Sequence, residues 1–341
     1  MNSMNSMNYK NYKNSINNLT FSMSANVSIN SNSDNNGNGN GNGNSNSNSN
    51  SNSNSNGDSN SNSNSNSNIT FSTCWYQFKA KFNFSVYAPW IRNMLSNVRA
   101  YNLVIYTDVA SCAAFDFNAY AAVNPRIRVV IKPFESFRNY ALKDFWIANH
   151  AKNALLNKLV DWRVNALWSE KVHFVHETVT QKYFDTDYYG WCDIGYFRGR
   201  TTGPVMLRDT PMSQLRGWPS PDKIAALNPD KIYYGCVNNN WTQIEQYIRS
   251  INDPTQTHGL DPSQNFIAGG FFMLHKTKAE WWATAYDAKL HEQLSQGRTV
   301  KDDQQIIAHC VFLKDMQSNF YICREKGVNY DAWFMFQRAL L

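Results

Sequence analysis

The most informative stretch of this 341-residue chain is residues 188–198, YYGWCDIGYFR. Its apolar run is typical of a buried strand, and it carries one acid, Asp193, before a turn at Gly195. Leaving a buried charge without its partner costs roughly 3 to 5 kcal/mol, so we expect a cation, a metal ion or a ligand group opposite Asp193. Asp193 is therefore the first candidate functional residue of the chain.

Strands and helices alternate around this stretch. Up to its end, the residue patterns predict strands at 69–76, 101–107, 126–132 and 188–194 and helices at 84–98, 140–167 and 170–179. Beyond a loop region at 199–230, they predict strands at 231–237 and 266–275 and helices at 241–250, 279–296 and 302–313. This order predicts an α/β fold with a mostly parallel central sheet and helices on its faces.

The first 68 residues differ from the rest of the chain. They are Asn, Ser and Gly in near-alternation, and their only charged residues are Lys10, Lys13, Asp34 and Asp58. Such a segment cannot bury a core, so residues 1–68 are predicted to be a disordered tail, either a spacer or a segment that self-associates through Asn amides. Residues 69–341 are long enough for one α/β domain.

Neither a signal peptide nor a transmembrane segment is expected. Polar residues interrupt every apolar segment near Met1, and the best apolar run elsewhere, residues 266–274, is about half the length that a membrane span needs. The six cysteines are widely spaced and include no Cys-x-x-Cys pair, which favours reduced thiols. We therefore expect a cytoplasmic protein.

The charge of the chain indicates the kind of ligand. The formal net charge is +6, and all of it belongs to residues 69–341 because the four tail charges cancel. A mild positive charge suits an anionic ligand such as a phosphate compound. It is too small and too scattered to indicate a nucleic-acid partner.

Two acidic motifs compete within ten residues. Asp185-Thr186-Asp187 is a literal Asp-x-Asp, the pattern with which many nucleotide-sugar transferases hold a divalent cation. It precedes the strand, however, whereas ligands of open α/β sheets bind at the carboxyl ends of strands. The intervening strand would hold Asp187 roughly 20 Å from Asp193. We therefore expect Asp185 and Asp187 to lie in a solvated turn, and Asp193 to lie at the site.

The chain resembles the HtrL/YibB-type protein family, which is similar to glycosyltransferases of the GT-A fold. The resemblance covers most of residues 69–341 and rests on Trp168-x-Glu170-Lys171, residues 184–188, residues 191–198, residues 103–108, residues 268–272 and residues 303–305. It implies a single GT-A-like domain that transfers a sugar from a nucleotide-sugar donor to a glycan or protein acceptor. A non-catalytic carbohydrate- or nucleotide-binding protein on the same fold is the competing reading.

The resemblance also implies a metal ion, Mn²⁺ or Mg²⁺, because GT-A enzymes use an Asp-x-Asp carboxylate to hold the cation that bridges the donor diphosphate. This chain has Asp193-Ile194-Gly195, so one carboxylate of the usual pair is missing. Three alternatives follow. Asp193 suffices together with waters and phosphate oxygens, another acid or a histidine such as His275 or His309 completes the shell, or a basic side chain replaces the ion.

Several other residues are expected at the substrate. Lys171, Arg198 and Arg200 are candidates to neutralise a diphosphate. Asp108 follows a strand, where an acid reads a base or ribose or, alternatively, caps a helix. The remaining expected contacts are Thr73 and Tyr76 in the first strand and the paired Gly269 and Gly270, which either admit a ligand or form a bulge.

The acidic segment that opens the last long helix supplies the expected catalytic residues, Asp302, Asp303 and Gln304. By the resemblance it faces the reacting sugar. Asp303 is the candidate general base if the reaction inverts the anomeric carbon. If the reaction retains the configuration, Asp303 or Gln304 instead positions the donor or stabilises developing positive charge. Helix capping is the structural alternative, since acids favour this position without any function.

Overall fold

The computed structural model describes residues 68–198, 210–253, 263–326 and 330–341. The predicted tail therefore lies almost wholly outside the described residues, as does Arg200. The described residues form a mixed α/β domain with a seven-stranded sheet. Its strands are β1 (Ile69–Trp75), β2 (Asn102–Thr107), β3 (Ile127–Ile131), β4 (Tyr188–Cys192), β5 (Ile232–Cys236), β6 (Ile267–His275) and β7 (Phe320–Arg324).

The strand order across the sheet is β3-β2-β1-β4-β6-β5-β7. Pairing is parallel from β3 through β2 and β1 to β4, and again between β5 and β7, whereas β6 runs antiparallel to both β4 and β5. The prediction of a mostly parallel α/β sheet is confirmed. The direction of β6 and the existence of β7 were not predicted.

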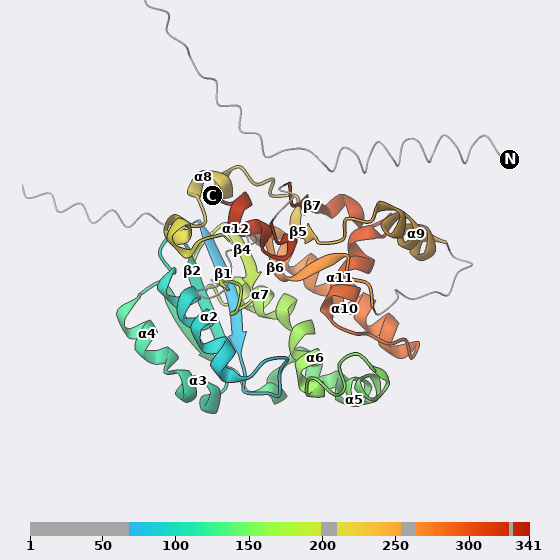
Figure 1. Ribbon diagram of the computed structural model, residues 1–341, viewed down its shortest axis with the longest axis horizontal. Helices are drawn as coiled ribbons and strands as arrows, with labels where there is room; N and C mark the ends of the chain where they lie inside the picture. Colours follow the sequence, from blue (N-terminus) through green and yellow to red (C-terminus); the bar gives the residue numbers. More distant parts are fainter. Residues whose placement is uncertain (1–67, 199–209, 254–262, 327–329) are drawn as a thin grey trace, which may run out of the picture. The chain divides into compact units, whose positions relative to one another are not determined.

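Helices lie on both faces of the sheet. Figure 1 shows α2, α3 and α4 beside β1 and β2, and α5, α6, α10 and α11 on the side of β6. The α-helices are α2 (Phe84–Ser96), α3 (Val109–Phe115), α4 (Phe117–Val123), α5 (Lys143–Lys152), α6 (Trp162–Ser169), α7 (Lys171–Thr180), α8 (Pro221–Ala225), α9 (Trp241–Asn252), α10 (Ala279–Ser295), α11 (Asp303–Phe312) and α12 (Met335–Ala339).

The prediction of a single helix at 140–167 is wrong. The segment contains α5 and α6, and α6 has its own N-cap, where the Asp161 side chain accepts a hydrogen bond from the Arg163 amide. The Asn153 side chain at the end of α5 donates instead to the backbone oxygen of Lys301, at 3.1 Å. The apolar stripe that suggested one helix is not buried, since Ile147 is 43% exposed and Leu159 is 55% exposed.

Alternate residues of β1 separate the two faces of the sheet. Ser72 faces α7, where its hydroxyl lies 2.8 Å from that of Thr178. Trp75 lies on the opposite face and packs against Tyr87 of α2, with ring centroids 5.2 Å apart. Tight packing continues in β4, where a Cβ atom on Gly190 would lie 2.3 Å from the backbone oxygen of Phe272. The period-two pattern thus assigns each side chain to one helical layer.

The register brings the carboxyl ends of three parallel strands to one edge of the sheet. Trp75 of β1 pairs with Thr107 of β2, and Ser72 pairs with Trp191 of β4. Because β6 is antiparallel to β4, its amino end reaches the same edge, where Trp191 pairs with Phe272. Asp193 follows β4 directly, so it lies at the ligand-binding edge of an open α/β sheet, as predicted.

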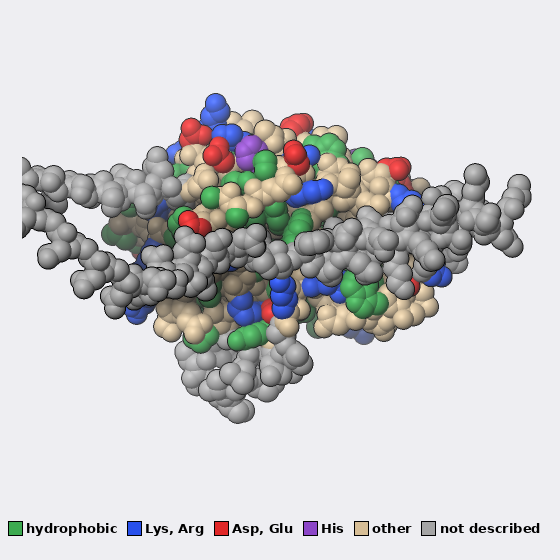
Figure 2. All heavy atoms as spheres, turned by 90° about the horizontal axis from the view of Figure 1, so that it is seen from above, with side chains coloured by type: hydrophobic (Ala, Val, Ile, Leu, Met, Phe, Trp, Pro, Cys, Tyr) green, Lys and Arg blue, Asp and Glu red, His purple; other side chains and the backbone are tan. Residues whose placement is uncertain are grey.

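The charged side chains of the described residues are mixed on the face seen in Figure 2. Figure 2 shows the visible Lys and Arg side chains spread among acidic and uncharged ones. Within the described ranges, no helix combines the length and the apolar character that crossing a bilayer requires. All six cysteines are free thiols.

Candidate functional site

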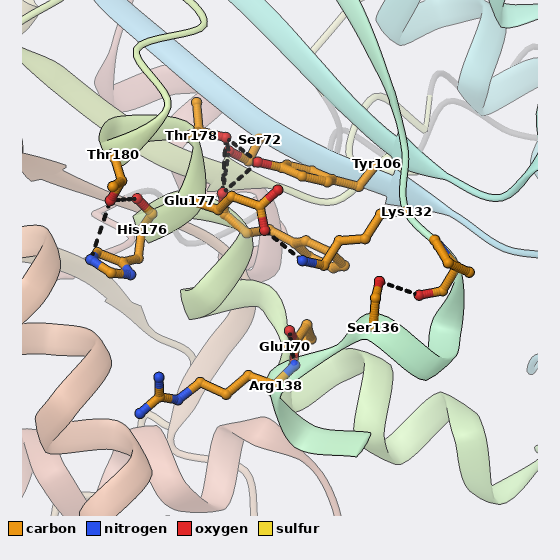
Figure 3. Close-up of polar contacts among 12 residues, drawn as sticks. Ser72, Tyr106, Lys132, Ser136, Arg138, Glu170, His176, Glu177, Thr178 and Thr180 are labelled. Carbon is orange, nitrogen blue, oxygen red and sulfur yellow. Dashed lines mark hydrogen bonds and ion pairs between the residues drawn. The ribbon is translucent and has the colours of Figure 1, made fainter. Parts of the chain in front are cut away.

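Helix α7 is fixed to the sheet by buried polar contacts (Figure 3). The Thr178 hydroxyl lies 2.8 Å from the hydroxyl of Ser72 in β1 and 2.9 Å from that of Tyr106 in β2. The Lys132 ammonium lies 2.5 Å from the carboxylate of Glu177. Satisfied buried networks of this kind hold one arrangement in place. They position the first turn of α7, which carries Lys171, against the carboxyl edge of the sheet.

Glu170 fixes the other side of the same turn. Its carboxylate accepts hydrogen bonds from the backbone amides of Arg138, at 2.8 Å, and Asn139, at 3.0 Å, and from the Asn139 side chain at 2.9 Å. Burial raises the pKa of Glu170, although these amides and the nearby charges of His173 and Lys132 oppose that effect. The acid of the Trp168-x-Glu170-Lys171 motif therefore has a structural task next to the site.

The Lys171 ammonium is the centre of the site. It lies 3.1 Å from Oδ1 of Asp193 and 3.1 Å from Oδ2 of Asp303, and it donates to the backbone oxygen of Gly269 at 2.9 Å. The Gly269 contact is a hydrogen bond, and the two carboxylate contacts are ion pairs. The Lys171 side chain is 8% exposed, that of Asp303 is 4% exposed, and that of Asp193 is 36% exposed. Asp193 is thus the outer carboxylate, accessible to a ligand, and Asp303 is the inner one.

The charges in this cluster shift one another's protonation equilibria. Burial by itself would lower the pKa of Lys171, but the two carboxylates outweigh it and hold the pKa above its usual value. Burial raises the pKa of Asp303 well above its usual value, against the opposing effect of Lys171, and the charges of Asp302 and Asp193 add to the rise. The cluster therefore keeps Lys171 charged.

Asp193 is held in one orientation by its neighbours. Its Oδ1 accepts a hydrogen bond from Nε1 of Trp191 at 2.6 Å, and its backbone amide donates to the oxygen of Gly270 at 2.8 Å. A Cβ atom on residue 195 would lie 3.1 Å from Cε3 of Trp90. The glycine that stands where a second Asp-x-Asp carboxylate would be is therefore packed against an aromatic ring.

Gly269 and Gly270 leave room for the two carboxylates. A Cβ atom on Gly269 would lie 2.5 Å from Oδ2 of Asp303, and one on Gly270 would lie 3.1 Å from Oδ2 of Asp193. Real Cβ atoms do not tolerate the first distance. The bulge alternative also holds, because the register of β5 and β6 shifts between Tyr234 and Cys236. At Gly269 and Gly270, β6 therefore both lies close to the two carboxylates and pairs irregularly with β5.

The start of α11 completes the cluster. Lys301 lies 3.5 Å from Oδ2 of Asp302 and 2.5 Å from Oδ1 of Asn265. Asp302 occupies the N-cap position, but its side chain makes no capping hydrogen bond. Within the described residues, Oδ1 of Asp302 and Oε1 of Gln304 are buried and have no hydrogen-bond partner. Side-chain capping, the structural alternative, is therefore not what holds Asp302 here.

Three predicted site residues are not among the described groups that pair with the Lys171 ammonium. Asp108 caps α3, since its side chain accepts from the Ser111 amide at 2.6 Å. The Tyr76 hydroxyl donates to the Lys132 backbone oxygen at 2.8 Å, and both Tyr76 and Thr73 are buried in the core. In this arrangement Tyr76 and Thr73 offer no surface to a ligand, and their contact with substrate stays a prediction.

Arg198 lies on the turn after Asp193. Its Nε donates to the Gly195 backbone oxygen at 2.9 Å, and its guanidinium lies 4.4 Å from the ring centroid of Trp90. The aromatic side of this turn was not predicted from the sequence. The signal that could have shown it is the run of aromatic residues at the beginning of α2, from Phe82 to Trp90, where Phe82 is exposed.

The other predicted or rejected metal ligands lie elsewhere. Asp187 is exposed before β4 and pairs with Lys276 at 2.8 Å, so the prediction of a solvated turn is confirmed for it. His275, at the far end of β6, lies 2.9 Å from the Thr277 hydroxyl. Among the described residues, no group of three or more His, Cys, Asp or Glu side chains is arranged to hold a metal ion. Asp193 and Asp303 converge on an ammonium instead, so the residues present do not fit Mn²⁺ or Mg²⁺.

No protein-family model matches the chain, and no curated protein matches it. Among solved structures, the galactosyltransferase LgtC in complex with donor and acceptor sugar analogues is similar to it at 13% identity, with 75% of this chain and 72% of that chain covered and a TM-score of 0.37. The resemblance to the HtrL/YibB-type family stays a prediction from the quoted residues.

Proposed function

We propose that this protein transfers a sugar from a nucleotide-sugar donor to a glycan or protein acceptor, on a GT-A-like domain of the HtrL/YibB type. One observation carries the proposal. Lys171 joins Asp193, Gly269 and Asp303 at the carboxyl edge of the sheet, although these residues come from separate parts of the sequence. Open α/β sheets bind ligands at this edge.

The exposure of each group suggests its role. Asp193 is the carboxylate that a donor can reach, and Arg198 on the following turn supplies a cation for the donor diphosphate. The raised pKa of Asp303 suits a general base near neutral pH. Its side chain is only 4% exposed and is paired with Lys171, which favours the positioning role over the general-base role. Asp302 and Gln304 are proposed to line the same region.

A screen of sugar nucleotides by thermal shift tests the proposal, with and without Mn²⁺. We expect at least one donor to raise the melting temperature and then to be hydrolysed or transferred. If no sugar nucleotide stabilises the protein, the proposal fails. Stabilisation by a donor with neither hydrolysis nor transfer to any acceptor would favour the non-catalytic binding protein, a reading supported by Gly195, which replaces the second carboxylate.

We also propose a reducing, cytoplasmic location. The support is that none of the six cysteines forms a disulfide, and that four of them are buried. Titration of the unfolded protein with a thiol reagent, after purification from cells without alkylation, counts its thiols directly. Fewer than six titratable thiols would contradict this location.

A further inference from the structure

The Asp193 and Asp303 carboxylates share a cation that belongs to the chain itself. We propose that the Lys171 ammonium occupies the position of a divalent cation between them, so that the site binds a sugar nucleotide's diphosphate without a metal ion. The inference rests on the proposed function. Of the three alternatives for the missing carboxylate, it selects the one in which a basic side chain replaces the ion, and it names Lys171 as that side chain. It assigns Lys171 as a positioning residue that fixes both acids.

The ligand set around Lys171 supports this assignment. Carboxylate and backbone carbonyl oxygens are the groups that hard cations such as Mg²⁺ prefer. Here two carboxylates and the Gly269 oxygen surround Nζ at 2.9 to 3.1 Å, which are hydrogen-bond distances rather than metal–oxygen distances. A divalent ion placed beside them would have to displace the ammonium or lie next to a like charge.

Displacement is opposed by how Lys171 is held. Its side chain is almost fully buried, and α7 is tied to β1 and β2 through Thr178. Gly269 and Gly270 let the two carboxylates pack directly against β6. The Trp191 indole fixes Asp193 further through its hydrogen bond to Oδ1. The site is thus organised around an ammonium before any ligand arrives.

The outer side of the cluster remains accessible to a diphosphate. Asp193 is the exposed member, and Arg198 follows it on the same turn with its guanidinium over Trp90. Arginine recognises phosphate oxygens through its planar fork of donors. Arg198 therefore supplies the direct phosphate contact, while Lys171 supplies the charge that a metal ion would otherwise bring to the carboxylates.

Binding of Mn²⁺, followed by electron paramagnetic resonance, tests the cation position without any donor. The wild-type protein is expected not to bind Mn²⁺ at the site, whereas Lys171→Met is expected to bind it at least about tenfold more tightly, because one positive charge has been removed between two acids. Adding Asp193→Asn to Lys171→Met should abolish that gain. Lys132→Met, which removes a half-buried lysine paired with Glu177, is the matched control and should bind no Mn²⁺.

Tight Mn²⁺ binding by the wild-type protein that Asp193→Asn removes would overturn the inference. No gain in Mn²⁺ binding by a folded Lys171→Met variant would do the same. If Lys171→Met does not fold, the titration of the wild-type protein with Mn²⁺ still tests whether the site binds a metal ion. Lys171→Arg provides a second variant, which keeps the positive charge and should bind no Mn²⁺.

Calorimetry with the sugar nucleotide found in the donor screen separates this inference from the proposed function. Equal donor affinity in EDTA and in Mn²⁺ is expected. A donor that binds only with Mn²⁺ would overturn the metal-free site and leave the proposed function standing. If UDP-sugars, GDP-sugars and other sugar nucleotides bind under neither condition, the proposed function fails, and the inference fails with it.

Discussion

A Cβ atom on residue 269 would lie 2.5 Å from Oδ2 of Asp303, so the inner carboxylate of the site lies where any larger residue at position 269 would place its side chain. The same carboxylate pairs with Lys171, whose ammonium also donates a hydrogen bond to the Gly269 backbone oxygen. One glycine therefore sets where β6 can lie, where α11 can begin and where Lys171 is held. This relationship makes Gly269 a sensitive position to test.

Gly269→Ala is expected to destabilise the protein by about 1 to 3 kcal/mol, since overpacking a well-packed site forces neighbouring groups to shift. Donor binding should fall with it, because Asp303 and Lys171 have to move. Urea unfolding measures the change in the free energy of unfolding. Gly217→Ala is the matched control, as a Cβ atom there would meet no atom within 4 Å. Equal losses in the two variants would mean that close packing at Gly269 is not the cause.

Lys171→Met should be among the most destabilising single substitutions, with a loss of about 3 to 5 kcal/mol, because it leaves two carboxylates without their buried partner. Adding Asp303→Asn should recover part of the loss by removing the inner charge. Lys276→Met breaks the exposed pair with Asp187 and should leave the urea midpoint unchanged. A Lys171→Met variant as stable as wild type would show that the ion pairs contribute no net stability.

The contribution of His309 to the stability of the protein should be lost in acid. Burial, aided by the charges of Lys289 and Arg298, lowers the pKa of His309 from 6.5 to about 4 in the folded protein. Between these two values the unfolded chain binds a proton that the folded protein does not, so the stability present above pH 6.5 is lost as the pH falls towards 4. At about 1.4 kcal/mol per pH unit, the full loss is about 3 kcal/mol.

Urea unfolding at pH 7 and pH 4.5 measures this loss, and His309→Gln should reduce it. The control is His291→Gln, which changes an exposed histidine and should keep the wild-type dependence. If His309→Gln retains the full acid sensitivity, other groups account for it.

Asp193→Asn is expected to abolish donor hydrolysis, since it removes the accessible carboxylate that pairs with the Lys171 ammonium. Changing both Asp185 and Asp187 to Asn should leave hydrolysis largely intact, because Asp187 lies in the exposed turn before β4 and pairs with Lys276. Both variants are compared by calorimetry and by release of free sugar. Similar losses would identify the Asp-x-Asp turn as part of the site.

Local patterns account for much of the fold. Apolar runs placed β1, β2, β3, β4, β5 and β6, and each lies within about one or two residues of its predicted bounds. The break between α5 and α6 could not be read locally, because the side chains of Asn149 and Asn153 bond to the backbone of residues 300 and 301, far along the chain. The apolar periodicity at 140–167 therefore predicted one long helix, whereas these tertiary contacts lie where α5 ends.

The candidate site could likewise be predicted only in part from local sequence. Neighbouring residues alone show that Asp193 ends a buried strand, that two glycines interrupt an apolar strand and that acids open a late helix. That Lys171 joins them depends on contacts between distant segments. That contact requires β6 to run antiparallel to β4, α11 to begin beside Gly269 and α7 to be fixed against β1, and these placements follow from packing between distant segments. Both carboxylates pair with Lys171, and their burial then sets which one faces the solvent, Asp193, and which one is enclosed, Asp303.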